Sequence, residues 1–285
     1  MKHVSTLLTA LVLASLAAFH AAEAAVSPTK PNIVFILADD LGWGDLSCHG
    51  HAFIKTPHID SLAQSGLNFQ QFTAANPVCS PSRVAFMTGR QPARFSIHGH
   101  FAAGLNQRRG MPDWLDPRVI LLPRLLRDAG YRTGHFGKWH LSNNHTVGAP
   151  YPDAYGFDEW AVFNGPGDRR TELPQNRTGE AVAAFIRANR DHPFYVNAWL
   201  HEPHTPHAPS RKAMEQHQGL PVRDQVYAAV VTDADNTVGL ILDTLRLSGL
   251  ESNTLVVFSS DNGPEHTGPE STWWFNAYGD IGLGD

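Results

Sequence analysis

The sequence contains few cysteines, no strong excess of charge of either sign and no long apolar run beyond its first residues. Only Cys48 and Cys79 occur among 285 residues, so at most one disulfide can form. The formal net charge of -5 gives no indication of binding to nucleic acid. No later segment has the roughly 20 apolar residues that a transmembrane helix needs. No internal repeat and no linker is visible, so the length fits one large domain or two small ones.

The first 24 residues have the pattern of a secretory signal peptide. A weakly basic start precedes an apolar run over residues 7–18, and residues 22–24, Ala-Glu-Ala, have the composition of a cleavage site. The run is short for a bilayer-spanning anchor, which is the alternative interpretation. We therefore expect a signal peptide over residues 1–24, a mature domain over residues 25–285, and export to the periplasm or secretion without a stable membrane anchor.

Short apolar runs alternate with helical patterns along the rest of the chain. This alternation predicts an α/β fold with a largely parallel central sheet flanked by helices. The predicted strands are residues 32–37, 131–136, 194–200 and 254–258. The predicted helices are residues 59–67, 121–129, 178–189 and 222–247, while residues 102–117 and 164–176 are expected to be loops.

Each predicted strand ends in a cluster of polar residues. The clusters are residues 39–40, 137–140, 201–204 and 261–263. Because ligands of open α/β sheets bind beyond the carboxyl ends of the strands, neighbouring parallel strands would bring these clusters to one rim. Taken singly, each cluster has another explanation, since Asp-Asp pairs cap helices or form turns and a lone lysine is more often a solvated surface charge.

The carboxylates at these strand ends indicate a metal site of a particular kind. Asp39 and Asp40, with Asp261 and Asn262, form an all-oxygen set that suits Ca²⁺ or Mg²⁺ and does not suit zinc. The histidines do not have the spacing of zinc proteases. Their nearest match, residues 201–204, contains a proline and cannot be the helical H-E-x-x-H motif.

The segment Cys79-Ser80-Pro81-Ser82-Arg83 is the most informative part of the sequence. A structural disulfide or a lone buried cysteine would explain Cys79 alone, but neither explains the proline and arginine that follow. Together with residues 84–90, this segment resembles the nucleophile signature of the sulfatases, in the alkaline phosphatase superfamily. The resemblance implies that a formylglycine-generating enzyme oxidises Cys79 to the aldehyde formylglycine. Cys48 is expected to be a small buried side chain.

The resemblance extends over residues 31–263 and implies roles for the polar clusters. Segments 39–42, 137–140, 203–206 and 261–262 resemble the family's metal-binding and active-site segments, in the same order. The implied metal, usually calcium, is bound by Asp39, Asp40, Asp261 and Asn262 and also touches the modified Cys79. The implied catalytic residues are Arg83, which holds the aldehyde hydrate, Lys138 and His204, which contact the sulfate oxygens, and His140, which assists proton transfer.

The resemblance also implies a mechanism. One hydroxyl of the hydrated aldehyde attacks sulfur while a histidine acid assists departure of the alcohol, and loss of the proton from the second hydroxyl then releases sulfate. The metal, Arg83 and Lys138 offset the repulsion between anionic reactants. Residues 82–87 are expected to begin a helix whose N-terminus favours an anion at Cys79.

The sequence departs from the family near its C-terminus. Sulfatases carry a second lysine after the Asp-Asn-Gly segment, yet no lysine or arginine follows Arg246 here, and the tail 271–285 is rich in glycine and tryptophan. We therefore expect an alkaline phosphatase-like domain that is incomplete, with the small C-terminal domain missing, and a chain that has weak or no activity and tends to aggregate.

The substrate expected from the resemblance is a sulfated small molecule or glycan. Two other functions remain open at this point. The chain could hydrolyse phosphate or phosphonate esters, as other members of the superfamily do. It could also be an inactive fragment that binds metal or sulfated glycans without chemistry.

Overall fold

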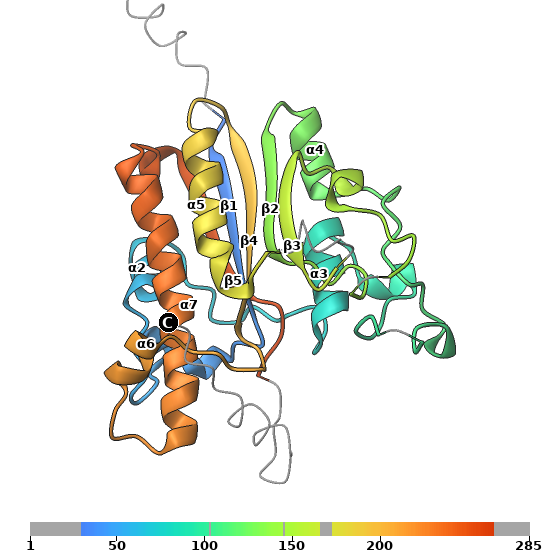
Figure 1. The fold of residues 1–285 in the computed structure, drawn as a ribbon. Coiled ribbons are helices and arrows are strands. Elements are labelled where there is room, and N and C mark those ends of the chain that lie inside the picture. The colour runs from blue at the N-terminus through green and yellow to red at the C-terminus, as the bar shows by residue number, and fades with distance from the viewer. Residues whose placement is uncertain (1–29, 103, 145, 166–172, 265–285) are drawn as a thin grey trace, which may run out of the picture. The chain divides into compact units, whose positions relative to one another are not determined.

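A five-stranded parallel sheet forms the centre of the chain from Asn32 onward (Figure 1). The computed structural model describes residues 30–102, 104–144, 146–165 and 173–264. The predicted signal peptide and the tail 271–285 lie outside these residues. The strands are β1 (Asn32–Asp39), β2 (Arg132–Lys138), β3 (Glu159–Phe163), β4 (Phe194–Pro203) and β5 (Thr254–Ser260). Their order in the sheet is β3-β2-β4-β1-β5, and every pairing is parallel.

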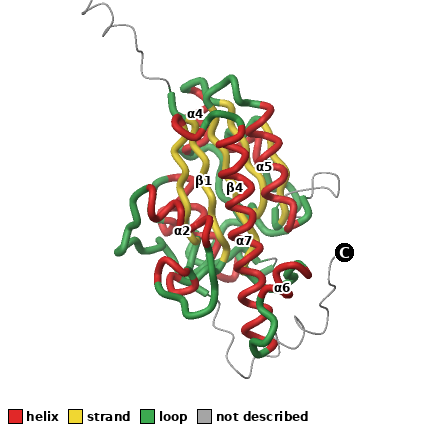
Figure 2. The backbone as a smooth tube through the Cα atoms, turned by 90° about the vertical axis from the view of Figure 1, so that its left-hand side faces the viewer, coloured by secondary structure: helices red, strands yellow, loops and turns green. Residues whose placement is uncertain are grey.

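Helices cover both faces of the sheet, which makes three layers (Figures 1 and 2). On one face lie α2 (Pro57–Ser65), α5 (Thr178–Ala188) and α7 (Val222–Leu247), with the short α6 (Arg211–Gln216) packed on α7. On the other face lie α3 (Cys79–Thr88) and α4 (Leu122–Asp128). In Figure 2, α5 and α7 cross in front of β1 and β4, which places the sheet behind them.

Strand β1 contributes to both apolar cores because successive side chains of a strand point to opposite faces. Val34 and Ile36 are fully buried in the core beneath α5 and α7. Phe35 and Leu37 are buried in the core shared with α3. Burial on both faces explains why this strand is an uninterrupted apolar run in the sequence.

The predicted fold class is confirmed, and so are the four predicted strands as parallel neighbours. The four predicted helices correspond to α2, α4, α5 and α7. Strand β3 and helix α6 were not predicted. The reason is that β3 is a five-residue strand that pairs with β2 at the edge of the described sheet, and α6 has only six residues, so neither has a long periodic pattern.

Two element boundaries differ from expectation by three residues, and the other boundaries of the predicted elements differ by at most two. Strand β4 continues through His201 and Glu202 to Pro203, because its ladder to β1 resumes after an irregularity and pairs Asp39 with Pro203. Helix α3 begins at Cys79, three residues before the predicted start. Pro81 is compatible with this start because the N–H groups of a helix's first turn have no intrahelical partner to lose. Within the described residues, no helix combines the length and apolar composition that crossing a membrane requires.

Candidate active site

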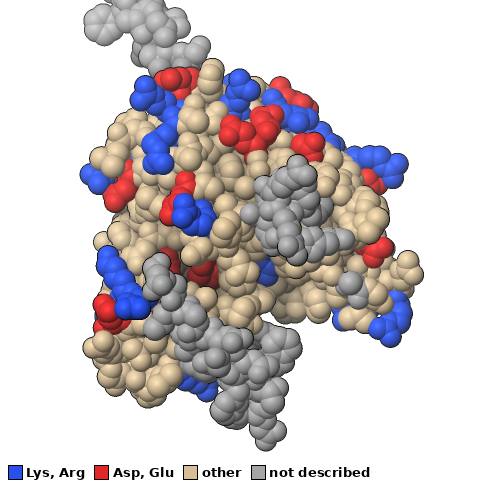
Figure 3. Space-filling model, in the orientation of Figure 1, with Lys and Arg blue, Asp and Glu red and all other residues tan. Residues whose placement is uncertain are grey.

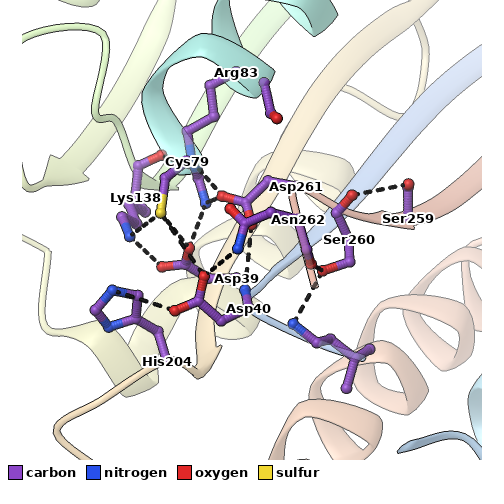
Figure 4. A network of polar contacts seen from close by, with 12 residues as sticks. Asp39, Asp40, Cys79, Arg83, Lys138, His204, Ser259, Ser260, Asp261 and Asn262 are labelled. Carbon is purple, nitrogen blue, oxygen red and sulfur yellow. Dashed lines mark hydrogen bonds and ion pairs between the residues drawn. The ribbon is translucent and has the colours of Figure 1, made fainter. Parts of the chain in front are cut away.

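Cys79 lies in the first turn of α3, and its side chain points toward the carboxyl ends of the strands (Figure 4). Val78 precedes the helix in an extended conformation, so the chain turns sharply at the cysteine. The first-turn residues Cys79, Ser80 and Ser82 are all buried, although serine is usually exposed. Ser80 Oγ accepts a hydrogen bond from the backbone N–H of Phe101 (3.1 Å), and Ser82 Oγ donates to the carbonyl of Asn76 (2.8 Å). These bonds anchor the start of α3.

The strand ends bring the predicted polar residues around this cysteine (Figure 4). Asp39 ends β1 and Asp40 follows it with a positive φ of 62°, a conformation that aspartate tolerates better than most residues. The backbone N–H of Asp261, directly after β5, donates to the carbonyl of Ala38 (3.1 Å) and thereby extends the pairing of β5 with β1. The two predicted carboxylate clusters are therefore neighbours because their strands are neighbours.

The thiol of Cys79 lies among charged groups. Its Sγ is 3.4 Å from Asp39 Oδ1, 3.9 Å from Asp40 Oδ1 and 3.5 Å from Lys138 Nζ. Burial, followed by the charge of Asp39, raises the pKa of the Cys79 thiol well above its usual value. An unmodified Cys79 would therefore stay protonated at neutral pH and would be a poor thiolate nucleophile.

Arg83 is one helical turn beyond Cys79 and is fully buried. Its Nε and Nη2 donate to Asp261 Oδ2 at 2.9 and 2.7 Å, and its Nη2 is 3.3 Å from Asp39 Oδ1. The guanidinium also lies 5.0 Å from the ring centroid of Trp199 on β4. Sequence patterns did not identify Trp199, which occurs within an ordinary apolar strand. Its ring limits the space around the guanidinium and adds a cation–π contact.

The buried carboxyls do not share one ionisation state. Burial raises the pKa of Asp39, but the neighbouring Lys138 and Arg83 outweigh it and hold that pKa well below the usual value. Burial and then the charge of Asp39 raise the pKa of Asp40. The same two causes, in that order, raise the pKa of Asp261 to about 7. Three carboxyls therefore lie close to two positively charged side chains, Arg83 and Lys138. A further positive charge at this place would stabilise the ionised forms of the carboxyls.

Two observations fit a bound divalent cation at this cluster. Ligand atoms of Asp39, Asp40, Cys79 and His204 all lie within 4.8 Å of one another. The buried Oδ1 of Asn262 has no hydrogen-bond partner among the described residues, while its Nδ2 donates to Asp40 Oδ1. An amide oxygen without a partner, next to ionisable carboxyls, is a donor set that suits a hard cation. The sulfur of Cys79 marks where an oxygen of a modified side chain would lie.

The predicted residues outside the carboxylate cluster differ in how closely they approach Cys79. Lys138 Nζ, almost fully buried, makes an ion pair with Asp39 Oδ2 besides its contact with Cys79. His204 Nε2 is 3.6 Å from Asp40 Oδ2. His140 is buried but, among the described residues, its one side-chain hydrogen bond joins Nε2 to the carbonyl of Phe101 (3.4 Å). The structure thus groups Lys138 and His204 with the cluster and places His140 beside it.

His140 is held in its neutral form. Burial lowers the pKa of His140 well below its usual value, and the charge of Lys138 lowers it further. Its Nδ1 has no hydrogen-bond partner among the described residues. A neutral imidazole with a free ring nitrogen can accept a proton or orient a hydroxyl group.

Curated proteins with similar sequences include several sulfatases, and solved structures with a similar fold include sulfatases and, at 20% identity and a TM-score of 0.60, a phosphonate monoester hydrolase of Agrobacterium radiobacter. N-acetylgalactosamine-6-sulfatase of Mus musculus is 35% identical over 280 residues, which cover 84% of this chain and 52% of the relative. Ulvan-active sulfatase of Formosa agariphila is 30% identical, with 83% of this chain and 51% of the relative covered. The crystal structure of Ps i-CgsB in complex with k-i-k-neocarrahexaose matches with a TM-score of 0.73 and 28% identity, and covers 83% of this chain and 59% of that one.

The match to the family extends over most of the sequence. The chain spans about half the length of the curated relatives it matches. The Sulfatase family profile matches residues 31–280, which include every residue of the cluster around Cys79. The chain belongs to the sulfatase family.

Proposed function

We propose that this chain carries the catalytic site of a sulfuric ester hydrolase whose nucleophile is formylglycine at position 79. The observation that carries the proposal is the position of Cys79: it starts a helix, and Lys138 and three buried carboxyls surround it. As a thiol, Cys79 would remain protonated, and a protonated thiol is a weak nucleophile. Oxidation to an aldehyde, whose hydrate supplies two hydroxyl groups for attack and release, removes this difficulty.

The chain's own residues account for binding and charge. Lys138 Nζ lies 3.5 Å from Cys79 Sγ, so it can contact an oxygen of a sulfate group bound at that position. His204, which is partly exposed beside Asp40, is placed to meet the same group from the solvent side. Arg83 is too deeply buried to reach the leaving group, and its role is to hold Asp261 and the hydrate in place. Neutral His140 is suited to accept a proton from a hydroxyl at position 79.

The proposed metal ligands are Asp39, Asp40, Asp261 and Asn262, with the modified Cys79 as a further contact. A bound Ca²⁺, or Mg²⁺ in its place, would supply positive charge toward the sulfuryl oxygens and lower the cost of bringing two anions together. The unpartnered Asn262 Oδ1 and the raised pKa values of Asp40 and Asp261 support this assignment.

The proposed substrates are sulfated carbohydrates. The names of two relatives and one solved neighbour refer to sulfated sugars, to ulvan and to k-i-k-neocarrahexaose. The expected signal peptide agrees with an exported enzyme that meets such polymers outside the cytoplasm. The charge on the surface does not restrict the substrate further, since acidic and basic side chains are interspersed over the described part of the face in Figure 3. The proposed maturation partner is a formylglycine-generating enzyme.

The test is mass spectrometry of the Cys79 peptide after co-expression with a formylglycine-generating enzyme, combined with turnover of 4-nitrophenyl sulfate. We expect the aldehyde mass at Cys79, an unmodified thiol at the control residue Cys48, and no turnover by Cys79→Ala. An intact thiol at Cys79 would contradict the proposal and favour a non-catalytic fragment. Faster turnover of 4-nitrophenyl phosphate than of the sulfate would identify a phosphate ester hydrolase instead.

A further inference from the structure

The turn that follows β1 and presents Asp40 is held by side-chain oxygens. Three successive backbone N–H groups donate to three different side chains: Asp40 to Asp261 Oδ1 (3.2 Å), Leu41 to Ser260 Oγ (3.0 Å) and Gly42 to Asp45 Oδ2 (2.7 Å). Two of these acceptors, Ser260 and Asp45, lie outside the proposed ligand set. Asp40 has a positive φ of 62°, and a residue other than glycine keeps this conformation only where its surroundings fix it. The bonds to Ser260 and Asp45 are therefore part of what fixes Asp40.

Ser260 joins the two segments that carry proposed ligands (Figure 4). Its Oγ accepts the hydrogen bond from the backbone N–H of Leu41 and donates to the backbone carbonyl of Asn262 (2.7 Å). The side chains of the two segments meet as well, since Asn262 Nδ2 donates to Asp40 Oδ1. One hydroxyl group therefore fixes the turn of Asp40 and the turn of Asn262 relative to each other.

Asp45 connects the same turn to helix α7. Its Oδ2 accepts hydrogen bonds from the backbone N–H of Gly42 and from the hydroxyl of Tyr227 (2.6 Å), which is 182 residues away in the sequence. The bond to Gly42 alone would only close the short 3₁₀ turn Trp43–Asp45, whereas the bond from Tyr227 adds a connection that this closure does not require. A Cβ at Gly42 would lie 2.6 Å from Asp45 Oδ2, so the carboxylate can approach only because residue 42 has no side chain.

We propose that Asp45 and Ser260 are positioning residues of the cation site, which hold the turn after β1 so that the Asp40 carboxylate faces Cys79. The positioning role rests on the cation site of the proposed function and adds residues that are not ligands themselves. Asp40 Oδ1 lies 3.9 Å from Cys79 Sγ, and Asp40 Oδ2 lies 3.6 Å from His204 Nε2. Loss of either bond frees the turn, so the carboxylate is less often in this position and the affinity for a cation falls.

The test is isothermal titration calorimetry of the whole chain with CaCl₂. We expect Asp45→Ala and Ser260→Ala each to raise the Kd of Ca²⁺ by about 10–100-fold, the usual effect of removing a group that holds a metal ligand. Asp45→Asn should keep most of the affinity, because its amide oxygen can still accept the bonds from Gly42 and Tyr227. Tyr227→Phe should weaken binding less than Asp45→Ala does, because the bond between Asp45 and Gly42 remains.

Two matched controls separate positioning from general stability. Ser259→Ala removes a hydroxyl that donates to the carbonyl of the adjacent Ser260 (3.2 Å). Asp60→Ala removes a carboxylate of α2 that, like Asp45, accepts hydrogen bonds from a backbone N–H (Cys48, 3.0 Å) and from a side-chain hydroxyl (Ser47, 2.6 Å). Both variants should keep the wild-type Kd of Ca²⁺, although Asp60→Ala should have a lower melting temperature without Ca²⁺.

Several results would contradict the positioning role. An unchanged Kd in Asp45→Ala or in Ser260→Ala would overturn it for that residue, and loss of Ca²⁺ binding in Asn262→Ala would show that the proposed cation site still stands. Equal weakening in Asp45→Asn and Asp45→Ala would overturn it for Asp45, because the charge and not the hydrogen bonds would be responsible. A similar rise of the Kd in Asp60→Ala would attribute the effect to stability and overturn it for both residues. A wild-type chain that binds neither Ca²⁺ nor Mg²⁺ would refute the cation site itself, and the positioning role with it.

Discussion

At the scale of single residues, the site depends on buried charges that hold one another in place. Arg83 is the centre of this arrangement because it is fully buried and contacts both Asp261 and Asp39. A buried ion pair adds little net stability, but removing one partner leaves the other as an uncompensated charge in a poorly solvated place. The same residue also carries one of the two fixed positive charges near Cys79.

Replacing Arg83 by methionine should therefore destabilise the chain by about 3–5 kcal/mol. Arg83→Lys should recover only part of this loss, because an ammonium group cannot reproduce the two guanidinium contacts with Asp261. Denaturation with urea, followed by circular dichroism, measures the difference. Arg90→Met is the control, since Arg90 is exposed just after α3. Equal unfolding midpoints for the two methionine variants would refute the argument.

Asp60 provides a pH-dependent test away from the metal site. Burial acts to raise its pKa, but hydrogen bonds from Ser47 Oγ (2.6 Å) and Thr56 Oγ1 (2.8 Å) outweigh burial and lower it. A carboxyl with a lowered folded-state pKa stabilises the fold above its unfolded pKa of about 3.9, and that contribution is lost as the pH falls through the folded-state pKa.

Asp60→Asn should thus lower the free energy of unfolding at pH 7 by roughly 1 kcal/mol or less, because Asp60 is partly exposed and solvent weakens its interactions. The difference from wild type should shrink below about pH 4. Urea denaturation at pH 7, 5 and 3.5 gives this difference directly. Asp128→Asn, at an exposed position on α4, should match wild type at every pH. If the loss of unfolding free energy in Asp60→Asn is the same at all three pH values, the charge of the Asp60 carboxylate does not contribute to stability.

At the scale of elements, close packing of β2 on β4 sets the position of Lys138. Gly137, the residue before it, has a positive φ of 109°, and a Cβ at this position would lie 1.9 Å from the carbonyl oxygen of Trp199. Only glycine therefore allows the two strands to approach at the point where β2 delivers the lysine to the cluster.

Gly137→Ala should destabilise the fold by at least about 3 kcal/mol, because backbone strain and a clash with backbone atoms act together. Gly44→Ala is the control, since a Cβ at Gly44 meets no atom within 4 Å. It should change stability by less than about 1 kcal/mol. The melting temperatures of the two variants distinguish them. If Gly137→Ala has the same melting temperature as the wild-type chain, β2 can shift to accommodate the added methyl group and the argument is wrong.

At the scale of the whole molecule, the carboxyl ends of four adjacent parallel strands form the floor of the site. A cation bound there would join β1 to the segment after β5 through Asp39 and Asn262, so its binding should stabilise the entire domain. On the edge strand β5, Leu255 is 54% exposed and Val257 is 38% exposed. Exposed apolar side chains on an edge strand favour pairing with another chain, which is the physical basis of the prediction that this chain aggregates.

Addition of Ca²⁺ should raise the melting temperature, by roughly 5–10 °C at a hundredfold excess over its Kd. Asn262→Ala should abolish most of this shift because it removes a proposed oxygen ligand. Asn68→Ala, at an exposed position, should retain it. Differential scanning calorimetry with Ca²⁺, with Mg²⁺ and with a chelator gives the shifts. Equal Ca²⁺ shifts in the two asparagine variants would exclude Asn262 as a ligand.

The sequence by itself determined the α/β class, four of the five strands and the polar residues at their ends, because continuous apolar runs and strand-end clusters are local patterns. It also indicated Asp39, Asp261 and Lys138 as parts of one site. Helix α3 begins three residues earlier than the sequence pattern suggested, and Pro81 is allowed there because it lies in the first turn.

Only the tertiary structure decided how these groups meet. The order β2-β4-β1-β5 makes residues far apart in the sequence neighbours, and strand order is a long-range property that local patterns do not encode. Trp199 under Arg83 and the connection from Tyr227 through Asp45 to Gly42 are likewise visible only in three dimensions. The physical reason is that burial, and with it the pKa of each group, depends on what packs around a side chain from distant parts of the chain.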